Sequence, residues 1–472
     1  MKHLKPLACR LIVCSFIAFT VASCSSDPNP VNFIKTTGEK AFVTLDLSVE
    51  ATRAEDSNAT TKETNVSKVS VYIFGDDDKL EKIHTDLTVT GNKIDKLETT
   101  SGLKTIYAVA AGSVSEVTEG TTTLSDFETA KIPSTIDKLK TSSGFLMIGK
   151  SEKRKVVKSS TQNAMPASNS FAIQLTRATA KAQVIESSSL NSNSADIGFR
   201  ITISHFAIRQ TANSFQLTPN ETDFQTFTDE GGNGTYDCYT ISSAESNDGF
   251  IAAQNTLSPD KCVYMPENIV ENPVTGNTTY LSVKVIMSPE QRYSFASGAS
   301  KPTIDESKKN QGATTYYVVG IIDTENGFAD YTIGEDNKVM CFHAEDDADR
   351  YRDALNGGSL SAFTVSDTDE AMKMPRHTRA ANLTYKTVTF AAAEAYYRIN
   401  IAKSEGESKK YRVDRNTFYK ITVNSVKTLG FPSEDMLRPT NPETSLELNP
   451  STWLDASFDI VPWNNVEQNV DL

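Results

Sequence analysis

β-Structure is indicated by Phe42-Val43-Thr44-Leu45-Asp46-Leu47-Ser48-Val49-Glu50, a stretch that alternates apolar and polar residues. One face of this stretch would carry Val43, Leu45, Leu47 and Val49. The opposite face would carry Thr44, Asp46, Ser48 and Glu50. Because successive side chains of a strand point to opposite sides of a sheet, the period of two predicts a half-buried strand.

The same period recurs along the chain in segments rich in Val, Ile, Thr, Tyr and Phe, the residue types enriched in strands. Strands are predicted at residues 69–73, 105–110, 145–148, 171–175, 180–185, 199–208, 280–287, 315–322, 395–401 and 418–426. Short helices are predicted at 124–131, ahead of Pro133, and at 347–355. Polar stretches at 186–194, 231–234 and 301–312 predict loops.

Many short strands separated by turn residues are typical of β-sandwiches. We therefore expect an all-β dominated fold with two β-sandwich domains, transthyretin-like or Greek-key in type, and a few short helices. A shift in composition near residue 190 marks a candidate boundary. It divides an N-terminal domain at 54–187 from a C-terminal domain at 188–472.

Composition bounds the function. The chain has 472 residues, 38% of them hydrophobic and 23% charged, which is enough to build more than one core. Its net charge of -13 argues against nucleic acid as a partner, because phosphate contacts need a basic face. There are five histidines, and the sequence has no Gly-x-Ser-x-Gly elbow, Walker loop, dinucleotide fingerprint or His-Glu-x-x-His motif. We therefore predict no enzyme activity, no catalytic residue, no cofactor and no metal site.

A few side chains could have a chemical role, but a structural role is the simpler interpretation. The cluster Asp76-Asp77-Asp78 could bind calcium, but it lacks the spacing of an EF-hand loop and follows a strand, so a solvated turn is favoured. His205 lies in an alternating strand and is interpreted as structural. Beyond the N-terminal segment three cysteines remain, of which Cys262 is expected in a core. A bridge between Cys238 and Cys262 stays open, with Cys341 left over.

The N-terminus resembles an export signal. Residues 1–23 combine a positive start with an apolar run too short to anchor in a bilayer. The run ends in Val21-Ala22-Ser23-Cys24, which resembles the lipobox of bacterial lipoproteins, so Cys24 is the predicted lipidation site. The alternative is an ordinary secretory signal with an incidental cysteine. The polar stretch at 25–30 then predicts a flexible tether.

The alternating strand is followed by Ala51-Thr52-Arg53-Ala54-Glu55-Asp56-Ser57-Asn58, a polar stretch without an apolar period. Such a segment is expected to be exposed, as proteolysis requires. Cleavage between Arg53 and Ala54 would release residues 24–53, a propeptide that holds the tether and the first strand. The simpler reading is an ordinary loop arginine. Arg379 is a rival site, but cleavage there would free no terminal strand.

The C-terminal segment, residues 453–472, stays apolar to its last residue. Its candidate contact residues are Phe458, Ile460, Trp463, Val466, Val470 and Leu472. Two readings are open, because the segment could pack as the last strand of its own domain or be offered as a strand to another molecule.

Short signatures spread along the chain carry a family resemblance. They are residues 21–24, 51–54, 175–181, 264–268, 415–419, 428–431, 461–463 and 470–472. In these segments the sequence resembles the Bacteroidales-type major fimbrial subunits, the fimbrillins of type V pili, and among them the shaft subunit of the short, or minor, fimbriae.

The resemblance implies a mechanism of assembly. The precursor would be an acylated (palmitate-bearing) lipoprotein of the outer membrane, and an Arg-specific protease would cut after Arg53. Loss of the strand with Val43, Leu45, Leu47 and Val49 would open a groove that the C-terminal strand of another copy fills. The partners would be further copies of the chain and fimbrial anchor and tip subunits, in an extracellular fimbrium that supports adhesion.

Two other readings remain open. Within the same family the chain could be an anchor or tip subunit. In a different class, it could be a monomeric glycan-binding surface lipoprotein, which would keep its lipid and need an exposed aromatic platform.

Overall fold

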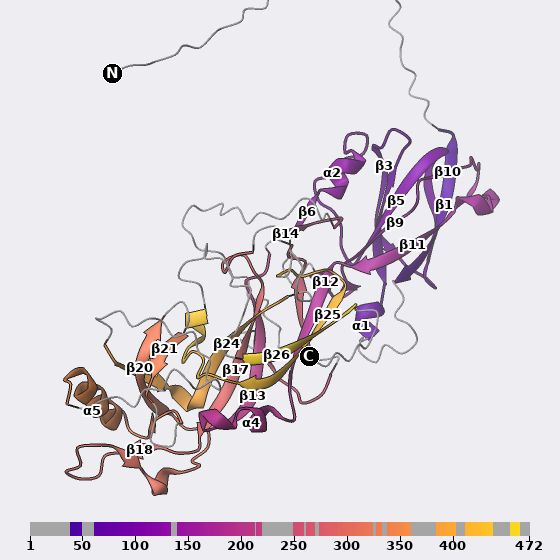
Figure 1. The fold of residues 1–472 in the computed structure, drawn as a ribbon. Helices are drawn as coiled ribbons and strands as arrows, with labels where there is room; N and C mark the ends of the chain where they lie inside the picture. The colour runs from indigo at the N-terminus through magenta and orange to yellow at the C-terminus, as the bar shows by residue number, and fades with distance from the viewer. Residues whose placement is uncertain are drawn as a thin grey trace, which may run out of the picture. The chain divides into compact units, whose positions relative to one another are not determined.

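Strands predominate over helices in the computed structural model, which confirms the all-β prediction (Figure 1). The structure describes residues 38–49, 61–133, 139–212, 214–219, 249–258, 261–269, 273–323, 327–332, 338–359, 384–402, 411–437 and 454–462. Its helices are α1 (Thr61–Thr64), α2 (Leu124–Glu128), α4 (Leu190–Asn193) and α5 (Glu345–Asn356). Short 3-10 turns are η1 (Gln162–Ala164), η2 (Ala167–Asn169), η3 (Ala195–Ile197), η4 (Glu306–Lys308), η6 (Ala391–Ala393) and η7 (Glu434–Leu437).

The N-terminal strands form an eight-stranded sheet. Its members are β1 (Lys40–Val49), β2 (Lys68–Phe74), β3 (Leu80–Thr88), β4 (Lys93–Thr100), β5 (Gly102–Ala110), β9 (Met147–Lys150), β10 (Arg154–Val156) and β11 (Ser170–Arg177). They follow the order β3-β2-β5-β9-β11-β1-β4, and β10 pairs with β5. One face buries an aliphatic core that β1, β2, β5 and β11 share. The other face packs the aromatic rings of Tyr72, Phe74 and Tyr107 against Phe127 of α2.

Two four-stranded sheets follow, in the orders β16-β12-β25-β26 and β15-β13-β17-β24. Their strands are β12 (Thr179–Glu186), β13 (Phe199–Arg209), β15 (Ile251–Ala252), β16 (Val263–Pro266), β17 (Tyr280–Pro289), β24 (Glu394–Asn400), β25 (Thr417–Val426) and β26 (Leu454–Pro462). Val184 and Ile421 from the first sheet share one buried core with Ile201 and Val283 from the second. The two sheets therefore face each other across this core.

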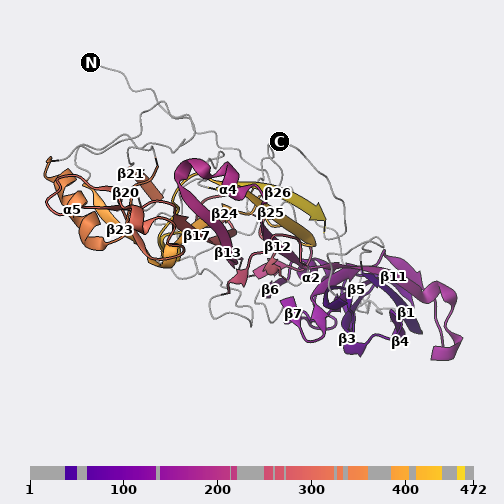
Figure 2. The same cartoon turned by 90° about the horizontal axis from the view of Figure 1, so that it is seen from below.

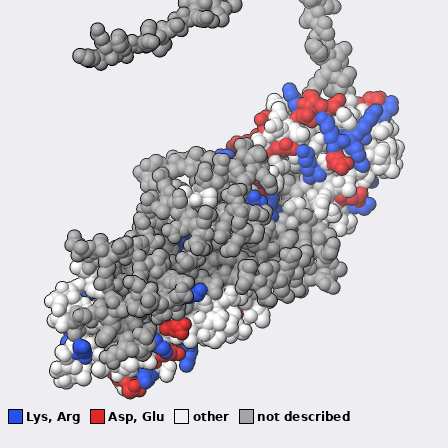
Figure 3. Space-filling view, viewed as in Figure 1, with Lys and Arg blue, Asp and Glu red and all other residues white. Residues whose placement is uncertain are grey.

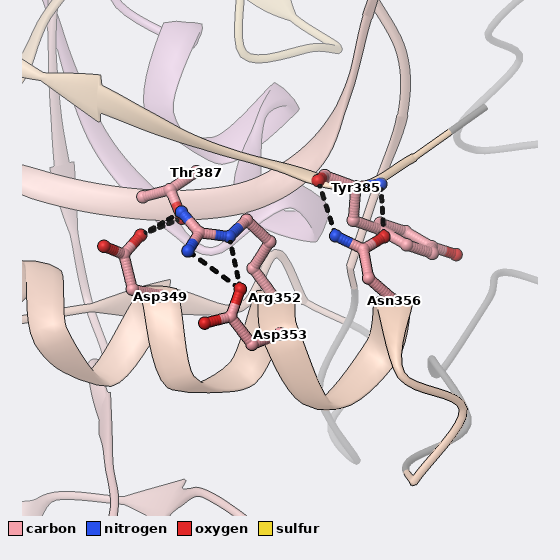
Figure 4. A network of polar contacts seen from close by, with 6 residues as sticks. All are labelled: Asp349, Arg352, Asp353, Asn356, Tyr385 and Thr387. Carbon is pink, nitrogen blue, oxygen red and sulfur yellow. Dashed lines mark hydrogen bonds and ion pairs between the residues drawn. The ribbon is translucent and has the colours of Figure 1, made fainter.

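A further sheet carries the order β19-β18-β22-β20-β21, with β23 paired to β20. Its strands are β18 (Tyr293–Ser294), β19 (Thr303–Ile304), β20 (Tyr316–Asp323), β21 (Gly327–Tyr331), β22 (Cys341–Phe342) and β23 (Lys386–Phe390). Helix α5 buries Tyr351 against Phe342 of this sheet, and burial raises the pKa of Tyr351 to about 12. Figure 4 shows the polar side of the same contact, where Arg352 lies between Asp349, Asp353 and Thr387, and Asn356 bonds the backbone of Tyr385.

The chain changes sheets at Ala178, which joins β11 to β12. This change comes ahead of the predicted domain boundary at residue 187. Because residues 39–472 form one compact unit, that boundary and the two-sandwich division stay predictions. The small two-stranded sheets are β14 (Ser214–Gln216) with β6 (Lys131–Pro133), and β7 (Lys140–Thr141) with β8 (Gly144–Phe145).

The strands predicted from alternation lie on observed strands, except that the one predicted at 145–148 spans the end of β8 and the start of β9, with Leu146 in neither. The helix predicted at 347–355 lies within α5. Three other predictions were wrong in detail. The helix predicted at 124–131 ends at Glu128, because residues 131–133 pair with β14 instead. The loops predicted at 186–194 and 301–312 contain α4 and β19 respectively. The loop predicted at 231–234 lies outside the described residues.

The aspartate cluster and Cys262 lie where the simpler interpretation put them, and His205 lies in β13. Asp76, Asp77 and Asp78 are exposed in a turn in which the Gly75 amide donates to the Lys79 carbonyl at 2.9 Å. Cys262 and Cys341 are buried. Cys238 lies outside the described residues, and so does any bridge that it would make.

Candidate functional site

The first strand lies inside the eight-stranded sheet (Figures 1 and 2). On one side, Thr44–Val49 pairs parallel with Ser170–Leu175 of β11. On the other side, β1 runs antiparallel to β4, from Lys40 opposite Thr100 to Asp46 opposite Lys93. The strand predicted to be removable is therefore flanked by two partners, and its departure would leave a gap between β11 and β4.

The apolar residues of β1 point into the core that the sheet encloses. Val43 and Leu45 are fully buried, Leu47 is nearly so, and Val49 is partly buried against the same core. All four residues predicted for the buried face thus lie there. The opposite face of β1 was predicted to be exposed. At its N-terminal end this is wrong, because Phe42 and Thr44 are also buried.

Residues between β10 and β11 bind the backbone of β1 on its β11 side, ahead of Thr44, where pairing with β11 begins. The Phe42 amide donates to Ser159 Oγ at 3.0 Å, and Asn169 Nδ2 donates to the Phe42 carbonyl at 2.9 Å. The Ser159 amide donates to the Lys40 carbonyl at 3.1 Å. β1 is therefore held on this side even where β11 does not reach it.

Charged side chains line the exposed part of β1. Asp46 accepts a hydrogen bond from Ser170 Oγ at 2.8 Å and pairs with Lys93 Nζ at 3.0 Å. The hydrogen bond from Ser170, followed by the contact with Lys93, lowers the pKa of Asp46. Figure 3 shows both signs of charge side by side over the described residues of this sheet. Exposed pairs of this kind are worth about 0–1 kcal/mol each, so burial of apolar side chains is the main force on β1.

Helix α1, the first described element after β1, is fixed by a buried carboxylate. Glu63 is fully buried and pairs with Lys181 Nζ, which lies 3.1 Å from both of its oxygens. Tyr264 donates its hydroxyl to Glu63 Oε1 at 2.8 Å, and Arg177 Nε donates to the Glu63 carbonyl at 2.8 Å. The chain on this side of Arg53 is thus attached to β11, β12 and β16.

Three of the segments that carried the family resemblance meet around this carboxylate. Arg177 reaches from the first segment to Asn416 of the third, with 3.1 Å between Nη1 and Oδ1. Arg415, also of the third segment, forms a buried ion pair with Glu267 of the second. The short signatures therefore form one polar network where β11 passes into β12.

The last described strand, β26, lies at the end of its sheet and runs antiparallel to β25. Phe458 stands opposite Ile421, and Ile460 stands opposite Tyr419. Trp463, Val466, Val470 and Leu472 lie outside the described residues. The donor assignment of the C-terminal segment stays a prediction, since β26 here pairs within its own chain.

The two predicted processing residues also lie outside the described part of the chain. Arg53 and Ala54 fall in the undescribed range 50–60, Arg379 in 360–383, and Cys24 in 1–37. Sequence reasoning, for its part, missed Glu63, Ser159 and Asn169. No periodicity marks them, because each acts through a contact with a residue far away in the chain.

Among the described residues, no three histidine, cysteine or acidic side chains gather as a metal site would require. No helix in the same ranges is long and apolar enough to cross a bilayer.

Two sequence models of protein families match the chain. The model described as major fimbrial subunit protein (FimA) matches residues 41–194, and the model described as major fimbrial subunit protein type IV, fimbrillin, C-terminal, matches 388–469. No curated protein sequence matches.

The chain is also similar, at low identity, to several solved structures. A fimbrilin (FimA) from Porphyromonas gingivalis W83 is 12% identical, over 92% of this chain and 99% of that one, with a TM-score of 0.44. A protein from Parabacteroides distasonis ATCC 8503 assigned to cell adhesion is 14% identical, over 90% and 99%, with a TM-score of 0.46. The tip fimbrial protein Mfa3 from Porphyromonas gingivalis is 11% identical, over 90% and 99%, with a TM-score of 0.36.

With TM-scores below 0.5 these likenesses carry no argument, and the family rests on the sequence models. One model includes β1 and the β11–β12 passage, the other includes β25 and β26, and together they span half of the chain. The chain therefore belongs to the fimbrillin family of major fimbrial subunit proteins.

Proposed function

We propose that this fimbrial subunit is the shaft subunit of a cell-surface fimbria and that it polymerises by protease-triggered strand exchange. The observation that carries the proposal is the place of β1. It is an interior strand, buried on its apolar face, and it ends at Val49, just ahead of Arg53. A single cut at Arg53 would separate this interior strand from the rest of the subunit.

The size of the effect supports a switch. Burial of Val43, Leu45 and Leu47 stabilises the precursor by about 5–9 kcal/mol, at about 1.5–3 kcal/mol for each side chain. A whole domain is typically stable by only about 5–15 kcal/mol. The uncut precursor is therefore a stable monomer, and a subunit without β1 is unstable until another strand fills the gap.

The contacts of Glu63 support the idea that only the segment before Arg53 leaves the subunit after cleavage. Residues that precede Arg53 would leave with β1, while α1 stays bound through Glu63, Lys181 and Arg177. The mature chain thus keeps its own N-terminal anchor next to the empty gap.

The replacement strand is the C-terminal segment, residues 453–472, of another copy. Main-chain hydrogen bonds to β11 and β4 supply generic pairing, and alternate apolar side chains such as Phe458 and Ile460 fill the core. The contact is head to tail, so each addition leaves a new open end and the assembly grows as a filament. The filament supports adhesion, as the family resemblance implies.

Before cleavage, the precursor is a lipoprotein held at the outer membrane through Cys24. The mature subunit then belongs to an extracellular fimbrium together with anchor and tip subunits. This part of the proposal rests on the Val21-Ala22-Ser23-Cys24 motif and on the family.

The test uses the purified precursor and an Arg-specific protease. We expect cleavage after Arg53, an N-terminal Ala54 on the mature chain, and filaments visible by electron microscopy. Arg53→Ala should block both cleavage and filaments, whereas the matched variant Arg379→Ala should block neither. A variant that lacks residues 456–472 should be cleaved but stay monomeric, and filaments from it would refute the C-terminal donor.

A further inference from the structure

The gap that β1 occupies contains two polar side chains that bind the backbone of the strand and no side chain of it. Ser159 Oγ accepts from the Phe42 amide at 3.0 Å, and Asn169 Nδ2 donates to the Phe42 carbonyl at 2.9 Å. These contacts lie upstream of Thr44, where pairing with β11 begins. Ser159 and Asn169 together are called the clamp below.

The clamp is buried and rigid. Asn169 is fully buried, and Ser159 is 4% exposed. Asn169 Oδ1 accepts from the Val157 amide at 2.9 Å, and Nδ2 donates to the Val157 carbonyl at 2.8 Å as well as to Phe42. Both hydrogens of the amide group are therefore used, and reversal of the group would break all three bonds.

Removal of β1 deprives Ser159 Oγ of the Phe42 amide and Asn169 Nδ2 of one of its two acceptors. A buried donor or acceptor that loses its hydrogen bond is costly, and the cost corresponds to about 10- to 100-fold in an equilibrium constant. The pairing edge of β4 cannot repair this, because it lies on the other side of the gap. The empty gap thus favours a strand that offers one backbone amide and one carbonyl at the position of Phe42.

We propose that Ser159 and Asn169 capture the backbone of the incoming strand and determine which strands the gap accepts. The inference rests on the proposed strand exchange and names the residues that select the donor. Because the clamp reads backbone groups, it accepts many side chains, but it excludes proline, which has no amide hydrogen. It also disfavours a strand whose pairing does not extend beyond Ser170, the first residue of β11. In the donor segment 453–472, Pro462 therefore cannot lie at the Phe42 position.

The test measures binding of a synthetic peptide with the sequence of residues 453–472. The acceptor is the chain lacking residues 456–472, cut after Arg53 in the presence of the peptide, so that the peptide can replace the β1 fragment as it leaves. Each residue of the peptide from 454 to 461 is N-methylated in turn, which removes one amide hydrogen at a time; residue 462 is proline and has none. At one position we expect N-methylation to weaken the binding of the peptide by about 10-fold or more. This weakening should disappear when the acceptor carries Ser159→Ala.

The chain offers a matched control in Ser151. Its Oγ accepts from the Ile106 amide at 2.9 Å, and Ser151 is similarly buried, but it touches no part of β1. Ser151→Ala should leave the N-methyl profile unchanged. In the uncut precursor, Ser159→Ala should speed hydrogen exchange of the Phe42 amide, and Ser151→Ala should not.

The outcomes separate the clamp from strand exchange itself. Peptide binding with the same N-methyl profile in the native acceptor and in Ser159→Ala would overturn the clamp and leave strand exchange standing. An unaltered exchange rate of the Phe42 amide in Ser159→Ala would also overturn it. Failure of every peptide to bind the cut acceptor would overturn strand exchange, and the clamp with it.

Discussion

A disulfide between β1 and β11 should stop assembly after cleavage without altering the core. Ser48 and Gln174 stand opposite each other in the parallel pair, and both are exposed. Neighbouring strands lie about 4.8 Å apart, within the Cα separation of about 4.4–6.8 Å that a disulfide allows. The double variant Ser48→Cys/Gln174→Cys would therefore link the removable strand to the subunit that holds it.

The free energy that holds β1 in the sheet differs between the uncut and the cut chain. The apolar contacts of β1 stay as they were, worth about 5–9 kcal/mol for Val43, Leu45 and Leu47. Once the chain is cut, however, binding of the strand becomes an association between two molecules, which costs an estimated 4–15 kcal/mol. The free energy gained from apolar burial and the cost of association are similar in size. A cut strand can therefore dissociate, whereas an uncut strand, which does not bear the association cost, stays in place. A disulfide removes the association cost and restores retention.

The assay follows cleavage by denaturing gel and assembly by electron microscopy. In the oxidised double variant we expect complete cleavage after Arg53, a β1 fragment that runs with the subunit, and no filaments until a reductant is added. A disulfide between Leu103→Cys and Lys155→Cys, opposite each other in β5 and β10, is the control and should permit filaments. Filaments from the oxidised Ser48→Cys/Gln174→Cys protein would show that β1 does not need to leave.

Three further changes test other parts of the structure. Glu63→Gln should lower the free energy of unfolding by about 3–5 kcal/mol in denaturant titrations, because it removes the carboxylate charge that pairs with the buried Lys181. Gly430→Ala should lower the melting temperature more than Gly298→Ala, because both residues have positive φ but a Cβ at Gly430 would lie 2.6 Å from a ring atom. The lowered pKa of Asp46 contributes stability that is present above about pH 4 and lost as pH falls through the folded-state pKa, so Asp46→Asn should flatten the acid end of the stability profile.

Alternation predicted strands such as β11, whose side chains alternate between a core and the solvent. Enrichment in Val, Ile, Thr, Tyr and Phe also indicated β2 and β5, which are buried on both faces. Alternation missed β3, because that strand has few buried residues. It missed β4 for a different reason, because Ile94 and Leu97 both point inward at a spacing of three. Lys96 between them has φ of 66°, and the pairing with β1 shifts register there, so a bulge breaks the period of two.

The candidate site could be predicted only in part, since its key contacts join distant residues. The sequence indicates the apolar face of β1, but not that β1 runs parallel to β11 and lies inside the sheet. A polar residue in a short turn, such as Ser159 or Asn169, has no sequence signal that separates it from an ordinary loop residue. The family segments were recognisable as signatures, yet their meeting around Glu63 depends on the way the sheets pack.

The different places of β1 and β26 would give the proposed exchange a direction. β1 pairs with both β11 and β4, so its loss opens a gap with two unpaired edges, and such edges favour pairing with another chain. β26 pairs with β25 alone among the described strands, so its departure opens no gap and leaves β25 as the new edge. A strand that moves from the edge of one subunit into the interior of another exchanges one paired side for two. The gap therefore has more to gain from a donor than the donor's own sheet has to lose.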